Sequence, residues 1–133
     1  MRVSGSRQVK QQVDRITARA KGGDPKAVRM ARHVYDRIRC LHELDDVPTE
    51  DTMRLRQVRQ SHKHPVWRLS HPYDPDVAVR SICWFDTAAA EVVVVLFFGG
   101  KAQMVDVFYD SVGTRADQII DQWIREHQEG GSR

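Results

Sequence analysis

The sequence predicts an α+β domain: an N-terminal helical hairpin packed on a three- to four-stranded antiparallel sheet, followed by a C-terminal helix. Apolar residues recur at helical spacing over 7–21 and 25–43, and three apolar runs rich in Val, Trp, Phe and Ile follow one another between 65 and 109. Helices and strands segregated in this way describe an α+β fold. At 133 residues the chain is expected to form one domain, with flexible ends at 1–6 and 128–133.

The helical hairpin is indicated by stop and start signals as well as by periodicity. A Gly-Gly pair at 22–23 ends the first helix, and Asp24 followed by Pro25 supplies an N-cap and a first helical residue for the second. A third apolar stripe predicts the C-terminal helix over 114–127. Four arginines lie beside the apolar stripe of the second helix and form a solvated face or, alternatively, part of a nucleic-acid surface: Arg29, Arg32, Arg37 and Arg39.

The strands are separated by turn residues. The prolines and aspartates of 72–76 connect the first run to a strand over 77–85, and residues 92–98 contain no polar side chain, which indicates a central strand covered on both faces. A Gly-Gly-Lys turn then leads to a last strand over 103–109. The segment 53–61 is an edge strand or a last helical turn, and its alternation favours the extended structure.

Charge is distributed unevenly along the chain. The sequence has 21 Lys and Arg against 18 Asp and Glu, but basic side chains concentrate between 54 and 80, which is the kind of patch that attracts phosphate. This patch comprises Arg54, Arg56, Arg59, Lys63, Arg68 and Arg80, with His62, His64 and His71.

Several classes of protein are disfavoured. Cys40 and Cys83 are expected to be reduced, buried thiols, and the first 21 residues lack the apolar region of a signal peptide, so we expect a cytoplasmic protein without a membrane segment. The three clustered histidines lack a matching second ligand pair, so no metal or other cofactor is expected. One of them is instead a candidate for proton transfer.

Arg68 and Arg80 are the most informative charged pair, because both are predicted to lie near the middle of adjacent strands. A guanidinium among apolar neighbours needs a partner. That partner is either a carboxylate (Asp76, Asp106 or Glu91) or a substrate phosphate, which the planar group can engage through two oxygens.

Other candidates surround this pair, each with a structural alternative. Lys101 is a solvated turn residue or part of the same anion site, and Tyr109 is core packing or part of that site. Trp67 and Trp84 are core residues, or aromatic surface on which bases stack beside Arg59, Lys63 and His64.

The segment PVWRLSHPYDPDVAVRSICWF, followed by VVVVLFFGGKAQ, resembles the RelE/HigB/ParE superfamily of bacterial toxins. In that family a strand with a basic residue leads through a turn into a strand carrying arginine, and a valine-rich strand and a Gly/Lys turn follow. The helical hairpin and closing helix also fit, so the resemblance covers most of residues 7–127.

The resemblance implies a small cytoplasmic toxin that is neutralised by a cognate antitoxin. RelE-like and HigB-like members are endoribonucleases that cleave mRNA, usually in the ribosomal A site, without a metal: the RNA 2′-hydroxyl attacks the adjacent phosphate. Carried onto this chain, the catalytic positions are Arg68, Arg80, Lys101, Tyr109 and His71, with His64 as an alternative proton carrier. The expected RNA-binding residues are Arg59, Lys63, His64 and Trp67.

The sequence also departs from the family pattern. Family members commonly begin with a short strand, which residues 1–6 do not resemble, and Asp106 and Asp110 follow Lys101 where further basic residues are often found. A non-enzymatic protein of the same fold therefore stands as the alternative, either a ParE-like gyrase poison or an accessory module for nucleic-acid or protein binding.

Overall fold

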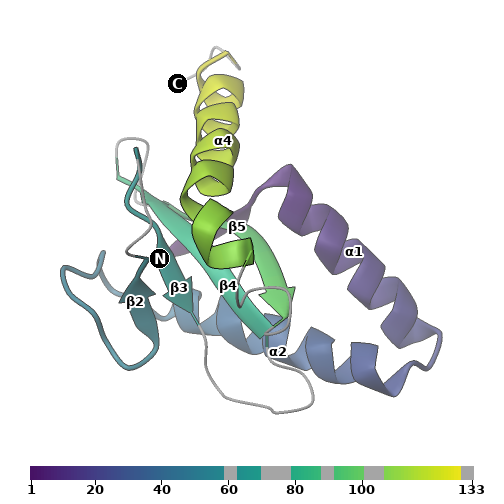
Figure 1. Cartoon of the computed structure of the whole chain (residues 1–133). Helices are drawn as coiled ribbons and strands as arrows, with labels where there is room; N and C mark the ends of the chain where they lie inside the picture. The colour runs from purple at the N-terminus through teal and green to yellow at the C-terminus, as the bar shows by residue number, and fades with distance from the viewer. Residues whose placement is uncertain (59–62, 70–78, 88–91, 101–106, 130–133) are drawn as a thin grey trace.

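The computed structural model describes residues 1–58, 63–69, 79–87, 92–100 and 107–129. Figure 1 shows their arrangement, with three helices around one sheet. None of the described helices is long and apolar enough to cross a membrane. The elements in chain order are β1 (Arg2–Gly5), α1 (Arg7–Lys21), α2 (Pro25–His42), β2 (Leu55–Gln57), β3 (Trp67–Leu69), β4 (Val79–Asp86), β5 (Val92–Gly100) and α4 (Val107–Glu129).

The five strands form one mixed sheet in the order β1-β5-β4-β3-β2. The β2, β3, β4 and β5 strands pair antiparallel, as predicted, whereas β1 pairs parallel to β5. The α+β class is therefore correct. The prediction of a purely antiparallel sheet with three or four strands is wrong, because it lacked β1.

Residues 1–6 were expected to be frayed, and the structure instead places a strand there. The segment is too short and too polar for a local strand signal, and its order comes from contacts distant in sequence. Ser6 donates from its backbone nitrogen to the Val95 carbonyl at 2.9 Å and from its hydroxyl to the Leu96 carbonyl at 2.6 Å. Beyond the end of β1, the Gln12 amide both donates to and accepts from the backbone of Phe98, at 3.0 and 2.9 Å. The pairing of β5 thus continues past the short strand.

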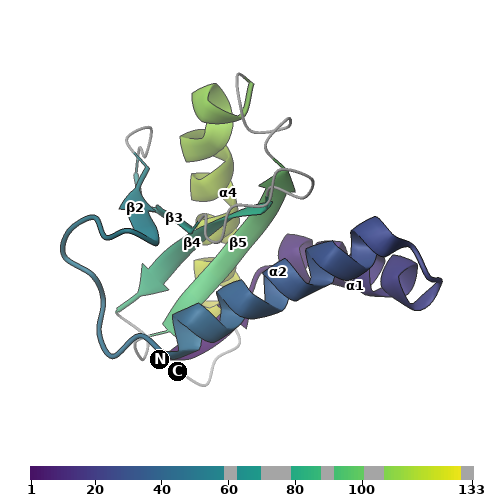
Figure 2. The same cartoon turned by 90° about the horizontal axis from the view of Figure 1, so that it is seen from below.

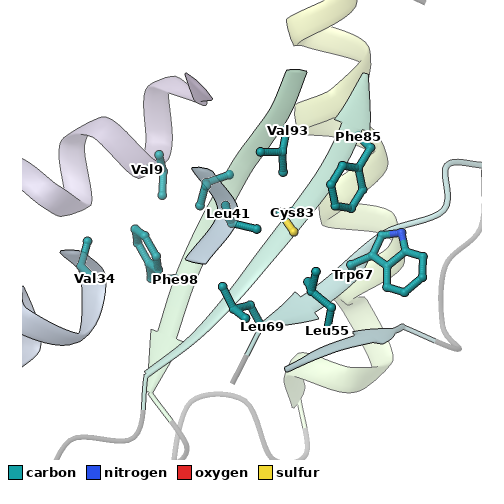
Figure 3. Close-up of a cluster of buried hydrophobic side chains, with 11 residues drawn as sticks. Val9, Val34, Leu41, Leu55, Trp67, Leu69, Cys83, Phe85, Val93 and Phe98 are labelled. Atoms are coloured by element: carbon teal, nitrogen blue, oxygen red, sulfur yellow. The ribbon is translucent and has the colours of Figure 1, made fainter. Parts of the chain in front are cut away.

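The sheet lies between the α1–α2 hairpin and α4 (Figures 1 and 2) and separates two clusters of buried apolar side chains. One face packs against α1 and α2 in the cluster of Figure 3, and the other packs against α4. Residues 93–96 alternate between the two clusters and are all buried, which confirms that the apolar run of β5 is covered on both faces. The first cluster comprises Val9, Val34, Leu41, Leu55, Trp67, Leu69, Cys83, Phe85, Val93, Val95 and Phe98, and the second Val58, Val66, Ile82, Trp84, Val94, Leu96, Ala116, Ile119 and Ile120.

Each hairpin helix begins directly after a capping residue, of which Asp24 was predicted and Ser6 was not. The Ser6 hydroxyl accepts from the Val9 backbone at 3.1 Å, and the Asp24 carboxylate accepts from the Lys26 backbone at 3.1 Å. One prediction for α2 is wrong: Arg37 does not lie on the solvated face but is 2% exposed, and burial lowers the pKa of its guanidinium to about 10.

The C-terminal helix begins earlier than predicted. The last strand was expected over 103–109, but 107–109 already belong to α4, and 101–106 lie outside the described residues. Apolar residues alternate over 103–109, which is typical of a strand. Residues 107–109 are nevertheless helical, because they continue the helix whose apolar stripe, from 116 onward, packs on the sheet. Gln128 and Glu129, expected to be flexible, end the helix.

The two cysteines are free, as predicted, but differ in burial. Cys83 is fully buried, and loss of solvation raises the pKa of its thiol to about 12. Cys40 is half-buried, and its sulfur accepts a hydrogen bond from the Arg54 guanidinium at 3.3 Å.

The close approach of β1 to α1 makes Gly5 a sensitive position. A Cβ atom there would lie 2.6 Å from Val9 Cγ1, and Val9 is itself buried. We expect Gly5→Ala to lower the free energy of unfolding by about 1–3 kcal/mol, as overpacking does, measured by urea denaturation. Gly22→Ala is the matched control, because its new Cβ would meet nothing closer than 3.4 Å. Equal stability of the two variants would contradict the close packing of Gly5 against Val9.

Candidate functional site

Two arginines face each other across the strands at the β2 edge of the sheet. Arg56 of β2 pairs directly with Arg68 of β3. Arg68 also pairs with Ile82, whose side chain belongs to the α4 layer, so both guanidinium stems leave the sheet on the α4 face. Arg56 is exposed and Arg68 half-buried. Like charges directly opposite one another destabilise a strand pair, so this position is a candidate for binding an anion, which would offset that cost.

The backbone of Arg80 lies near this pair, on the adjacent strand β4. It pairs with Gly99 of β5 and precedes by two residues Ile82, the partner of Arg68. Positions related diagonally in this way are about 7–8 Å apart, within reach of long side chains. The register therefore places the two arginines on adjacent strands, as predicted, but Arg80 lies near the start of β4 and not near its middle.

The remaining predicted catalytic residues have different placements. Tyr109 lies in the first turn of α4, not on a strand as predicted. His71 and Lys101 lie outside the described residues, as does Arg59 of the predicted RNA surface.

Lys63 and His64 are held by α4. The Asp117 carboxylate accepts from both backbone nitrogens, at 2.9 Å from Lys63 and 3.0 Å from His64. Asp121, one helical turn further along α4, lies 3.0 Å from both the Lys63 ammonium and His64 Nε2. We call these four residues the α4 clip, which fixes the connection between β2 and β3 onto the helix.

The hydrogen bonds within the α4 clip favour the charged form of the Asp121 carboxylate. The hydrogen bonds from His64 and then from Lys63 hold the pKa of Asp121 below its usual value. The His64 side chain is only 16% exposed, and its ring meets the edge of Trp84 with a centroid distance of 5.7 Å. The α4 clip thus partly neutralises the positive charge that was expected to bind RNA at these two residues.

Trp67 does not fit its predicted role in RNA binding. Its side chain is 5% exposed and packs edge to face with Phe85 in the layer covered by α1 and α2 (Figure 3). Trp84 is also buried, at 8% exposure. The core alternative that the sequence left open is therefore the observed one for both rings.

Three residues of this region were not singled out from sequence. Arg56 was counted within the basic patch, but only the β2/β3 register shows that it opposes Arg68. Asp117 and Asp121 are four residues apart on the polar side of the α4 stripe, a spacing that places two side chains on one helix face and could have marked them as a pair.

The Arg56–Arg68 pair is a candidate site for an anion. No group of three or more His, Cys, Asp or Glu side chains among them is arranged to hold a metal ion. Two cavities that the described residues form, of about 350 and 490 Å³, border the α1/α2 side and contain neither Arg56 nor Arg68. The candidate anion-binding pair therefore does not line either cavity; Arg56 is exposed, and Arg68 is half-buried.

Models of known protein families, curated proteins and solved structures were compared with the chain, and none matches it.

Proposed function

We propose that this chain is the toxin of a toxin-antitoxin pair, an endoribonuclease that cleaves mRNA without a metal and in association with the ribosome. The carrying observation is the cross-strand pair of Arg56 and Arg68, with position 80 one diagonal step away on β4. Arginines at three neighbouring backbone positions of adjacent strands suit a substrate with closely spaced phosphates. The parallel β1 strand adds support, because it supplies the short first strand whose apparent absence separated this sequence from the RelE-like pattern.

The proposed reaction needs only the RNA and charged side chains. The 2′-hydroxyl gives up its proton to a general base as its oxygen forms a bond to the adjacent phosphorus. The bond from phosphorus to the 5′-oxygen of the next nucleotide breaks, and that oxygen takes up a proton, which leaves a 2′,3′-cyclic phosphate and a 5′-hydroxyl. Arg68 and Arg80 stabilise the negative charge that grows on the phosphate oxygens, which is where fixed cations lower the barrier most. Lys101 adds electrostatic support.

Proton transfer is assigned to His71 and Tyr109. His64 is a weaker candidate, because Nε2 of its ring is held 3.0 Å from Asp121 and the side chain is largely buried. Its role in this proposal is to position the β2–β3 connection.

The partners follow from the same proposal. A cognate antitoxin protein neutralises the toxin, and the substrate is mRNA on a cytoplasmic ribosome. The proposal includes no metal and no other cofactor.

A non-enzymatic protein of the same fold is the second candidate, and one observation favours it. Trp67 serves the core, and Lys63 and His64 are engaged by the carboxylates of the α4 clip, so three residues expected to bind RNA have structural roles. This candidate is a ParE-like gyrase poison or an accessory binding module.

Induced expression in a bacterial host tests the proposal. We expect the wild type to arrest growth and Arg80→Ala to relieve the arrest while remaining folded, because the phosphate loses one of its stabilising cations. Arg125→Ala is the control, since it removes an exposed arginine from α4 and should leave the arrest intact. Undiminished toxicity of Arg80→Ala would remove Arg80 from the site, and a DNA-damage response without transcript cleavage would favour the gyrase poison.

A further inference from the structure

The helical hairpin carries more positive charge than the chain as a whole. Residues 7–42 contain ten Lys and Arg against three Asp and no Glu, a formal charge of +7, whereas the whole chain carries +3. The remainder of the protein is therefore net acidic. Because α1 and α2 are fully described and pack against each other, this charge is concentrated on one structural unit.

The outward side of α2 arranges part of this charge in a row, which we call the α2 basic face: Arg29, Arg32, Tyr35 and Arg39. All four side chains are exposed and recur every three or four residues, so they lie on one side of the helix, opposite buried Val34 and Leu41. The row extends for about 15 Å along the axis. Asp36 lies beside it and contacts Arg39 at 3.8 Å, with both side chains at least half exposed.

The α2 basic face is remote from the Arg56–Arg68 pair. The hairpin covers one face of the sheet and the two arginines project from the other, which α4 covers. Both views show the α1–α2 turn extending beyond the strands (Figures 1 and 2). Because the sheet lies between them, the α2 basic face and the Arg56–Arg68 pair are separate surfaces.

We propose that the α2 basic face binds the phosphate backbone of double-helical RNA and thereby docks the protein on a structured RNA. The choice of RNA as the polyanion rests on the proposed function, whereas the surface itself rests on the charge and geometry of α2. The protein then holds its substrate strand on one face of the sheet and its docking RNA on the other.

The chemistry of the α2 basic face favours a nucleic-acid backbone over an acidic protein. Protein interfaces have an apolar, desolvated centre, whereas nucleic-acid interfaces are more polar and more positive. Among the described residues, Tyr35 is the one large hydrophobic residue of α2 that is exposed, at 66%, and its hydroxyl can itself contact phosphate. A single aromatic ring among arginines suits backbone contacts rather than a series of stacked bases.

Fluorescence anisotropy of the purified full chain with a short fluorescein-labelled RNA duplex tests this proposal over a range of salt concentrations. We expect the double variant Arg32→Ala/Arg39→Ala to bind about tenfold more weakly at low salt and to lower the log–log salt slope by about two, one for each lost phosphate contact. Arg125→Ala, which removes one exposed arginine from α4, should leave the slope unchanged. Circular dichroism confirms the fold of each variant.

An unchanged slope in the double variant would overturn the proposal. The proposal would also be overturned if poly-glutamate displaced the labelled duplex as effectively as unlabelled duplex does at equal charge, because the surface would then not distinguish a nucleic-acid backbone from an acidic polypeptide. Failure of the proposed nuclease gives a different result: the wild type cleaves no transcript, yet duplex binding still depends on Arg32 and Arg39. Conversely, Arg68→Ala should lose cleavage and retain duplex binding.

Discussion

Arg68→Ala is expected to slow mRNA cleavage by about 10²–10³-fold, the usual cost of removing a fixed group that stabilises charge in the transition state. Arg68 is the central arginine of the candidate site, because it pairs directly with Arg56 and lies one diagonal step from position 80. The rate is measured on a defined message with ribosomes and the purified chain. Arg68→Lys should be intermediate, since ammonium keeps the charge but loses the two-pronged contact with phosphate.

A second variant separates this role from a structural one. Arg68 is half-buried, whereas Arg56 is exposed on the edge strand. We therefore expect Arg56→Ala to retain the unfolding transition of the wild type and to lose about tenfold in rate. Full activity of both alanine variants would place the chemistry elsewhere on the protein.

Asp117→Ala is expected to lower stability by about 1–3 kcal/mol, because one carboxylate accepts hydrogen bonds from two successive backbone nitrogens and charge-assisted hydrogen bonds contribute about this much. In a thermal unfolding experiment the melting temperature should fall by roughly 5–10 °C. Gln118→Ala is the matched control, since Gln118 is the adjacent, exposed residue of α4. An equal, small shift in both variants would show that the α4 clip contributes nothing to stability.

The α4 clip also predicts how stability depends on pH. Asp121 has a folded-state pKa below its unfolded value of about 3.9, so its contribution is fully present above that pH and is lost as the pH falls toward the folded-state pKa. Because the Asp121 side chain is about one-third exposed, solvent reduces the size of this effect. Asp121→Asn should therefore show a flatter acid limb in unfolding measured against pH, and an acid limb unchanged from wild type would contradict the assignment.

The sequence predicted those parts of the fold that local signals determine. The α1 and α2 helices were predicted because caps and apolar spacing agree over 15 and 18 residues, and the interior position of β5 because its apolar run is uninterrupted. The β1 strand was missed because the order of Arg2–Gly5 depends on pairing with residues about 90 positions away. The start of α4 was misplaced because a helical and an extended period overlap in 107–109.

The sequence predicted which strands of the candidate site are neighbours, but not the register in which they pair. The strand order that brings Arg68 and Arg80 together follows from a simple meander, so their neighbouring positions were predicted. The opposition of Arg56 and Arg68 depends on the register of a three-residue strand, which no local pattern specified. Trp67 and Trp84 illustrate the same limit, because alternation shows that two rings point to opposite faces but not that helices cover both faces.

The most direct test of the central claim is to map 5′ ends on cellular mRNA after induced expression of the wild type, Arg68→Ala and Arg125→Ala. We predict new ends within reading frames for the wild type and Arg125→Ala and none for Arg68→Ala, with all three chains folded and equally abundant. If the folded, well-expressed wild type produces no new ends, the chain is not an mRNA endoribonuclease, and a protein or DNA target must be sought instead.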